Sequence, residues 1–108
     1  MGRLVYDGTA RLTVDDRELA HLQFVISEKL RRREPFTFTW PNGLEDGGGR
    51  MAVWVNAQTP LVFSFDGRAP HSLNPAWLKV LTAAAHSPGG LQLIPEPAPE
   101  ESERGSSI

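Results

Sequence analysis

Residues 15–34, with the sequence DDRELAHLQFVISEKLRRRE, predict one long amphipathic helix around which the rest of the chain is organised. Leu19, Leu22, Ile26 and Leu30 recur at intervals of three and four residues, so their side chains should form one apolar stripe. We expect Val25 and Phe24 to widen this stripe. Burying a side chain of this size stabilises a fold by roughly 1.5–3 kcal/mol, so the stripe is the expected centre of the core.

Both ends of this helix carry residues that helix ends favour. Asp15 and Asp16 are suited to cap the first turn, because a short carboxylate accepts hydrogen bonds from the unpaired amides there. The pair Glu34-Pro35 predicts the end, since the residue before a proline avoids the α region. The last turn and the residues after it hold a basic run that faces the negative end of the helix dipole: Lys29, Arg31, Arg32 and Arg33.

Short alternating segments on either side of the helix predict five or six strands. They are residues 3–6 and 10–14 before the helix, and residues 36–40, 51–56, 61–65 and 91–94 after it. The clearest is FTFTW at residues 36–40, whose aromatic residues alternate with threonines and predict one buried and one exposed face. Asp7-Gly8 between the first two strands favours a tight antiparallel hairpin.

A second helix should begin at Asn74-Pro75, which pairs an N-cap with a proline at the first helical position. The predicted order is strand–strand–helix–strand–strand–strand–helix–strand. This order indicates an α+β fold, with a mostly antiparallel sheet of about five or six strands and two helices packed on it. We expect a single α+β domain over residues 1–94, followed by a disordered, acidic and proline-rich tail over residues 95–108.

Composition and charge restrict the class of protein. The chain has 108 residues, of which 40% are hydrophobic, and no cysteine, so we expect one modest core without disulfides or thiolate metal sites. No apolar run approaches the roughly 20 residues of a membrane helix, and the first residues do not resemble a secretory signal, so a cytoplasmic location is expected. Residues 95–108 hold four glutamates and one arginine, which leaves the preceding residues with a net charge of only +1.

No assembled catalytic set is evident in the sequence. Residues 64–67 (SFDG) resemble the lysine-x-aspartate-glycine motif of nucleotidyl-transfer enzymes, but Ser64 stands where the nucleophilic lysine is required. Residues 47–50 (GGGR) lack the lysine and the following helix of a phosphate-binding Walker loop, so a flexible hairpin connection is the simpler interpretation. His21, His71 and His86 are too far apart to indicate a metal site. We expect no catalytic residue, metal or cofactor.

Arginine-rich segments are the best candidates for a binding surface. The candidate binding residues are Lys29, Arg31, Arg32, Arg33, Arg50 and Arg68. Arginine forks match phosphate and carboxylate geometry, so the partner would be nucleic acid, an acidic protein or the chain's own acidic tail. The alternative interpretation is a solvated helix end without a partner.

Three segments of the chain carry a resemblance to known proteins: the LAHLQ…KLRR helix, the FTFTW strand and the SPGGLQLIPEP segment. Through them, over about residues 1–97, the chain resembles a family of short actinobacterial proteins of unknown function. Members of that family often carry the automatic label "ATP-dependent DNA ligase", which implies a DNA-joining enzyme that uses ATP. The family offers no catalytic motif that can be transferred to residues of this chain.

Three functions therefore stay open at the level of sequence. The first is a small non-catalytic binding module that acts through the arginine-rich helix end. The second is a homodimeric structural protein that associates through an exposed sheet edge or a tryptophan face. The third is an enzyme related to DNA ligases, which the serine at position 64 argues against.

Overall fold

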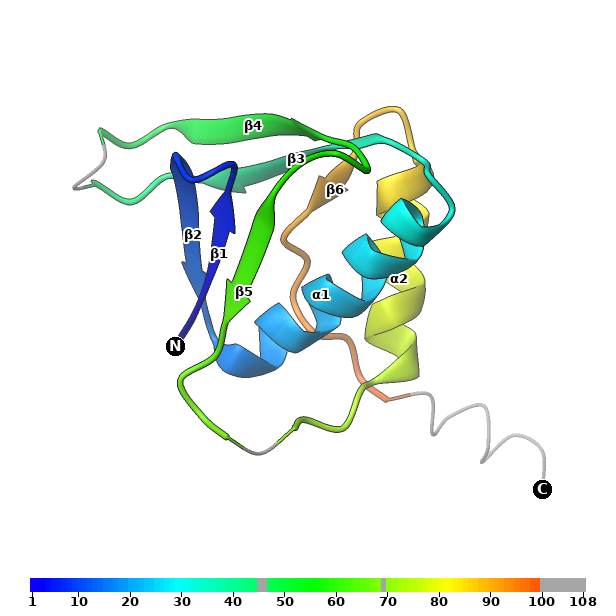
Figure 1. Ribbon diagram of the computed structural model, residues 1–108. Coiled ribbons are helices and arrows are strands. Elements are labelled where there is room, and N and C mark those ends of the chain that lie inside the picture. The colour runs from blue at the N-terminus through cyan, green and yellow to red at the C-terminus, as the bar shows by residue number, and fades with distance from the viewer. Residues whose placement is uncertain (45–46, 69, 100–108) are drawn as a thin grey trace, which may run out of the picture.

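The computed structural model of the chain describes residues 1–44, 47–68 and 70–99. The elements are β1 (Gly2–Tyr6), β2 (Ala10–Val14), α1 (Asp16–Arg31), β3 (Phe36–Pro41), β4 (Arg50–Val55), β5 (Leu61–Ser64), α2 (Pro75–His86) and β6 (Leu91–Gln92). Their order and the α+β class are as predicted (Figure 1). Within the described residues, neither helix is long and apolar enough to cross a membrane.

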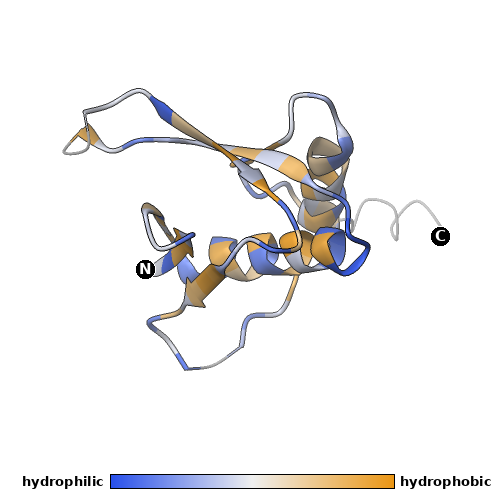
Figure 2. Cartoon of the chain, turned by 45° about the horizontal axis from the view of Figure 1, so that its top comes forward, coloured by the Kyte–Doolittle hydropathy of each residue, from blue (hydrophilic) through white to orange (hydrophobic). Residues whose placement is uncertain are grey.

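The strands form two three-stranded sheets where one sheet was expected. In the first sheet the order is β2-β1-β5, with both pairs antiparallel. In the second the order is β4-β3-β6, where β3 and β4 form an antiparallel hairpin and β6 runs parallel to β3. Figure 1 shows the two helices on one flank of the sheets, and Figure 2 shows the β3–β4 hairpin extending away from the helices.

The apolar stripe of α1 lies at the centre of the core, as predicted. Leu19, Leu22 and Ile26 are at most 1% exposed, and Val25 widens the stripe as expected. The prediction for Phe24 is wrong, because its side chain is 43% exposed. At 3.6 residues per turn, position 24 falls on the opposite side of the helix from Leu22 and Ile26.

The FTFTW strand also behaves as predicted. Phe36, Phe38 and Trp40 of β3 are at most 3% exposed and belong to the core. Trp54 lies opposite Thr37 in the hairpin, on the other face of the sheet, and is 56% exposed. The hairpin therefore has one face in the core and one face in solvent, which is the usual arrangement in an antiparallel sheet.

Gly90 allows the chain to pass from α2 into β6 at very short range from β3. Its φ is +81°, a conformation that side chains disfavour. A Cβ atom at this position would lie 2.4 Å from the backbone oxygen of Thr37. The neighbouring Gly89 has no positive φ, and a Cβ atom added there would come no closer than 3.9 Å to its nearest neighbour, the Ser87 hydroxyl.

Replacing Gly90 with alanine is expected to lower the free energy of unfolding by roughly 2–4 kcal/mol, because a strained φ and a backbone clash add together. Gly89→Ala is the matched control and should change it by less than about 0.5 kcal/mol. Urea unfolding followed by tryptophan fluorescence measures both. Equal effects of the two substitutions would contradict the close contact between Gly90 and β3.

Candidate binding groove

A groove of about 530 Å³ runs along the side of α1 that does not face the core. The residues of α1 that line it recur at helical spacing: Ala20, Gln23, Phe24, Ser27, Glu28 and Arg31. The opposite wall is the connection between β5 and α2, which contributes Phe65, Arg68, Pro70, His71 and Leu73. The groove is therefore built from one helix face and one long connection.

The groove combines an apolar floor with basic side chains. Phe24 and Leu73 are 43% and 36% exposed, which leaves a large part of each in contact with solvent. Arg31 comes from α1 and Arg68 from the facing connection, so the groove has one arginine on each wall. Arg31 also forms an exposed pair with Glu28 at 2.5 Å, and a pair of this kind contributes little to stability.

Among the six predicted binding residues, the structure brings Arg31 and Arg68 together in the groove. Arg32 and Arg33 are exposed just beyond the last turn of α1, where Arg33 adopts a positive φ of 57°. Arg50 begins β4 and lies on the hairpin that extends away from the helices (Figure 1).

Lys29, the sixth predicted residue, is only 7% exposed and makes internal contacts. Its Nζ atom lies 3.3 Å from Glu34 Oε1 and 3.1 Å from His86 Nδ1. It also lies 6.0 Å from the centre of the Phe36 ring. These contacts join the carboxyl ends of α1 and α2, so the Lys29 ammonium group contributes to the packing of the two helices.

Asp16 holds the start of the connection between β5 and α2, which forms the opposite wall of the groove. Its carboxylate accepts hydrogen bonds from the backbone amides of Asp66, at 3.2 Å, and Gly67, at 2.8 Å. The Gly67 amide is the main reason that the pKa of Asp16 is lowered. The prediction that Asp15 and Asp16 cap the helix through their side chains is therefore corrected. Asp15 occupies the N-cap without a side-chain hydrogen bond, and Asp16 binds the turn after β5.

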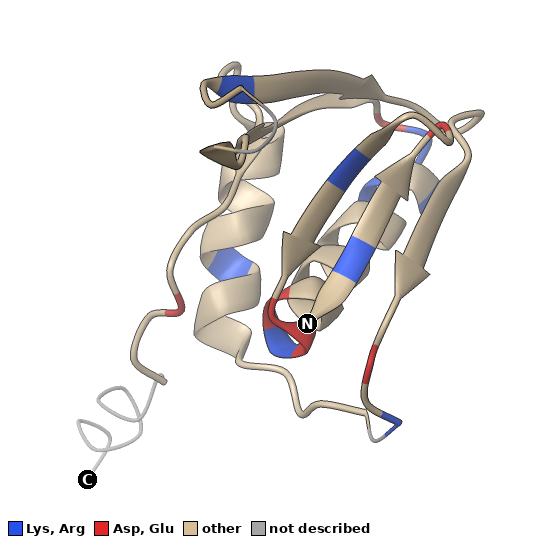
Figure 3. Cartoon of the chain, turned by 90° about the vertical axis from the view of Figure 1, so that its left-hand side faces the viewer, with Lys and Arg blue, Asp and Glu red and all other residues tan. Residues whose placement is uncertain are grey.

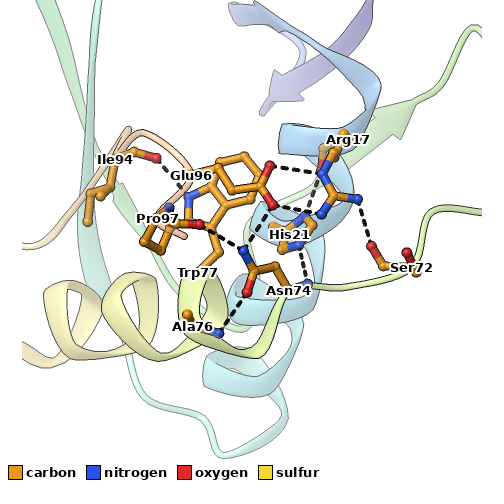
Figure 4. A network of polar contacts seen from close by, with 9 residues as sticks. All are labelled: Arg17, His21, Ser72, Asn74, Ala76, Trp77, Ile94, Glu96 and Pro97. Atoms are coloured by element: carbon orange, nitrogen blue, oxygen red, sulfur yellow. Dashed lines mark hydrogen bonds and ion pairs between the residues drawn. The ribbon is translucent and has the colours of Figure 1, made fainter. Parts of the chain in front are cut away.

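The other end of the connection is held by a network around Glu96 (Figure 4). Arg17 donates to both carboxylate oxygens of Glu96, at 2.9 and 2.7 Å, and a third hydrogen bond joins it to the Ser72 carbonyl at 2.8 Å. The Asn74 side-chain amide donates to Glu96 and to the Pro97 carbonyl. These contacts lower the pKa of Glu96 to about 2, chiefly through Arg17.

His21 joins α1 to the start of α2 and is completely buried. Its Nε2 atom accepts a hydrogen bond from the backbone amide of Asn74 at 2.8 Å, so the proton is on Nδ1, which donates to the Arg17 carbonyl at 2.7 Å. Its ring packs 4.4 Å from that of Trp77. Burial lowers the pKa of His21, and the neutral ring satisfies both partners. The Asn74 side chain caps α2 through Ala76, as predicted.

The contacts of Glu96 and Pro97 show that the chain stays attached to the domain beyond Ile94, where we expected the domain to end. The Trp77 indole donates to the Ile94 carbonyl at 2.7 Å and holds the same segment from the α2 side. Most of the predicted disordered tail, residues 100–108, lies outside the described residues, and its disorder stays a prediction.

We expect the free energy of unfolding to fall in two stages on acidification. Below about pH 6.5 the unfolded chain takes up a proton at His21 that the folded state resists. Between about pH 4.5 and 2 the stabilisation from ionised Glu96 is lost, because its folded pKa lies below its unfolded value. Urea unfolding at a series of pH values measures this profile.

Two variants separate the contributions of Glu96 and Glu18 to the pH dependence of the free energy of unfolding. Glu96→Gln should flatten the loss between about pH 4.5 and 2. Glu18→Gln should make the acid loss steeper, because burial raises the pKa of Glu18 and its protonation favours the folded state. A profile that Glu96→Gln leaves unchanged would contradict the role given to the Arg17–Glu96 pair.

Comparison with known proteins gives one match. The model of a domain of unknown function, DUF7882, matches residues 1–96. No curated protein and no solved structure matches the chain significantly. The expected membership of a family of unknown function is thus confirmed, whereas the ligase label and the actinobacterial origin gain no support from these comparisons. Because the match covers most of the chain, the protein belongs to the DUF7882 family.

Proposed function

We propose that this protein is a non-catalytic binding module whose α1 groove holds an acidic segment of a partner protein, anchored by an apolar side chain. The observation that carries the proposal is that exposed Phe24 lines the same groove as two arginines from separate parts of the chain, Arg31 and Arg68. The groove thus offers both apolar surface and positive charge to the same ligand.

The apolar floor supplies the non-directional part of the binding. A single exposed phenylalanine is common on protein surfaces, but Phe24 lies in a groove whose far wall contains Phe65 and Leu73. A partner side chain inserted between the walls would remove all three from water, which favours association. Small residues of α1, Ala20 and Ser27, leave room for it on either side of Phe24.

The basic side chains supply the preference for an acidic ligand. Guanidinium groups bind carboxylates through two parallel hydrogen bonds, and Arg31 and Arg68 approach from opposite walls. Arg32 and Arg33 continue the positive surface past the end of α1. Nucleic acid is the weaker alternative, because residues 1–94 carry a net charge of only +1 and phosphate contacts depend on many cations.

An enzymatic role related to DNA ligases has less support. Ser64 occupies the position of the motif lysine, at the end of β5. The backbone amides of the following Asp66-Gly67 turn donate to Asp16, so this turn is engaged in holding the groove wall. Within the described residues, no group of three His, Asp or Glu side chains is arranged to hold a metal ion.

A homodimer is the second candidate, favoured by the exposure of Trp54 on the outer face of the hairpin. The Tyr6 hydroxyl donates to the Trp54 carbonyl at 2.7 Å, which engages part of the β4 edge. A dimer would therefore use the outer face of Trp54 more readily than the strand edge. Light scattering that shows a monomer at high protein concentration would contradict the homodimer.

Reversing the charge of both groove arginines, in Arg31→Glu with Arg68→Glu, should reduce capture of the partner from native cell lysate at least about tenfold. Removal of part of the apolar floor in Phe24→Ala should also weaken capture, with little effect on unfolding because the side chain is partly exposed. Quantitative mass spectrometry of proteins captured by the tagged full chain provides the measurement.

Arg3→Glu is the matched control, because this exposed arginine lies in β1 outside the groove (Figure 3). Capture that survives the double charge reversal would remove the proposed site. Capture that nuclease treatment abolishes would favour nucleic acid as the ligand. The midpoint of urea unfolding of each variant should first be shown to equal that of the wild-type protein.

A further inference from the structure

A second surface, separate from the α1 groove, is a cleft of about 550 Å³ between β2 and the β3–β4 hairpin. One wall is formed by residues 9–13, and the other by residues 40–43 together with Met51. β2 is the outermost strand of its sheet. The cleft is therefore bounded on one side by a sheet edge.

Hydrogen bonds at the end of β1 show which of its peptide groups face β2. The Tyr6 carbonyl accepts a hydrogen bond from the Thr9 amide at 3.0 Å and so points toward β2. The Asp7 amide donates to the Pro60 carbonyl at 2.8 Å, on the side of β5. Peptide groups point alternately to the two sides of a strand, so Leu4 and Tyr6 bond toward β2.

The register then identifies the peptide groups of β2 that face the cleft. Leu4 and Tyr6 lie opposite Leu12 and Ala10, which therefore bond to β1. Arg11 and Thr13 alternate with these residues, so their N–H and C=O groups point out of the sheet edge. In the part of the chain that the structure describes, no strand pairs with this edge.

We propose that this edge binds an extended segment of a partner protein as an added strand, with an acidic side chain opposite Arg11. A row of backbone donors and acceptors is best satisfied by another extended backbone. Arg11 is exposed on the face of β2 opposite to that of buried Ala10 and Leu12, where an acidic residue opposite it would be a close cross-strand neighbour.

The opposite wall of the cleft determines which ligand residues are favoured on either side of the acidic residue. Side chains alternate between the faces of a strand, so the flanking residues would point to the face that Ala10 and Leu12 share. Met51, from the inner face of the hairpin, lines the cleft on that side. The preferred ligand is thus an apolar–acidic–apolar sequence in an extended conformation.

A second copy of the chain fits the edge less well than a partner of this composition. Two β2 edges paired antiparallel about Arg11 would use the most peptide groups but would place two arginines directly opposite each other. Like charges in that position are destabilising. The acidic partner instead satisfies the same backbone groups and neutralises the arginine.

The test uses a blocked heptapeptide with a central glutamate, a valine on each side of it and threonines at the other positions. Hydrogen exchange of the full ¹⁵N-labelled chain is measured with and without this peptide at millimolar concentration. The amides of Arg11 and Thr13 should exchange at least about tenfold more slowly with peptide present. The amides that border the α1 groove should be unaffected, which keeps this result independent of the proposed function.

Methylated peptides provide the matched control on the ligand side. In an added strand that runs antiparallel to β2, the more stable direction of pairing, N-methylation of the central glutamate removes a hydrogen bond to the edge and should abolish the protection, whereas N-methylation of an adjacent valine should preserve it. Thr13→Pro should also abolish binding, whereas Thr13→Val should retain it. Arg11→Glu should reverse the preference to a peptide with a central lysine.

Three results would overturn the proposal. The first is unchanged exchange at Arg11 and Thr13 with the peptide present. The second is binding that does not distinguish the two methylated peptides. The third is protection of the same amides without peptide at high protein concentration, which would show that a second copy occupies the edge.

Discussion

Burial of one stripe of α1 places every other element of this fold. Leu19, Leu22, Val25 and Ile26 are almost completely enclosed, and the β2-β1-β5 sheet, the β3–β4 hairpin and α2 all contribute residues to the core around them. An amphipathic helix such as α1 buries only one side of its circumference. The remaining face, which includes Phe24, is free to form a groove with a neighbouring segment. The proposed binding surface is thus the side of the same helix that the core leaves exposed.

The long connection from β5 to α2 becomes the second wall because polar contacts hold it at both ends. Asp16 holds its start, and Arg17, the next residue, holds its end through the Ser72 carbonyl. The same arginine binds Glu96, so the segment after β6 is tied to the groove wall (Figure 4). The first turn of α1 therefore controls the position of two segments that are distant in sequence.

The two proposed surfaces use the same chemical combination in different geometries. In the α1 groove, arginines on separate walls flank an apolar floor, which suits a segment held by its side chains. In the cleft beside β2, one arginine lies on an edge with outward peptide groups, which suits a segment held by its backbone. Their separate locations are compatible with contacts to two parts of one partner, or to two partners.

The sequence alone determined the elements, their order and the buried faces of α1 and β3 except at Phe24, because these follow from local periodicity. It also identified Asn74 as the cap of α2, since capping depends on neighbouring residues. The division of the strands into two sheets and the burial of Lys29 and His21 were decided by tertiary contacts. Arg31 and Arg68 line the same groove and Arg50 lies elsewhere, because the path of the chain between distant residues sets their separation. Local sequence patterns do not predict that path, whereas hydrophobic spacing predicts which side of each element is buried.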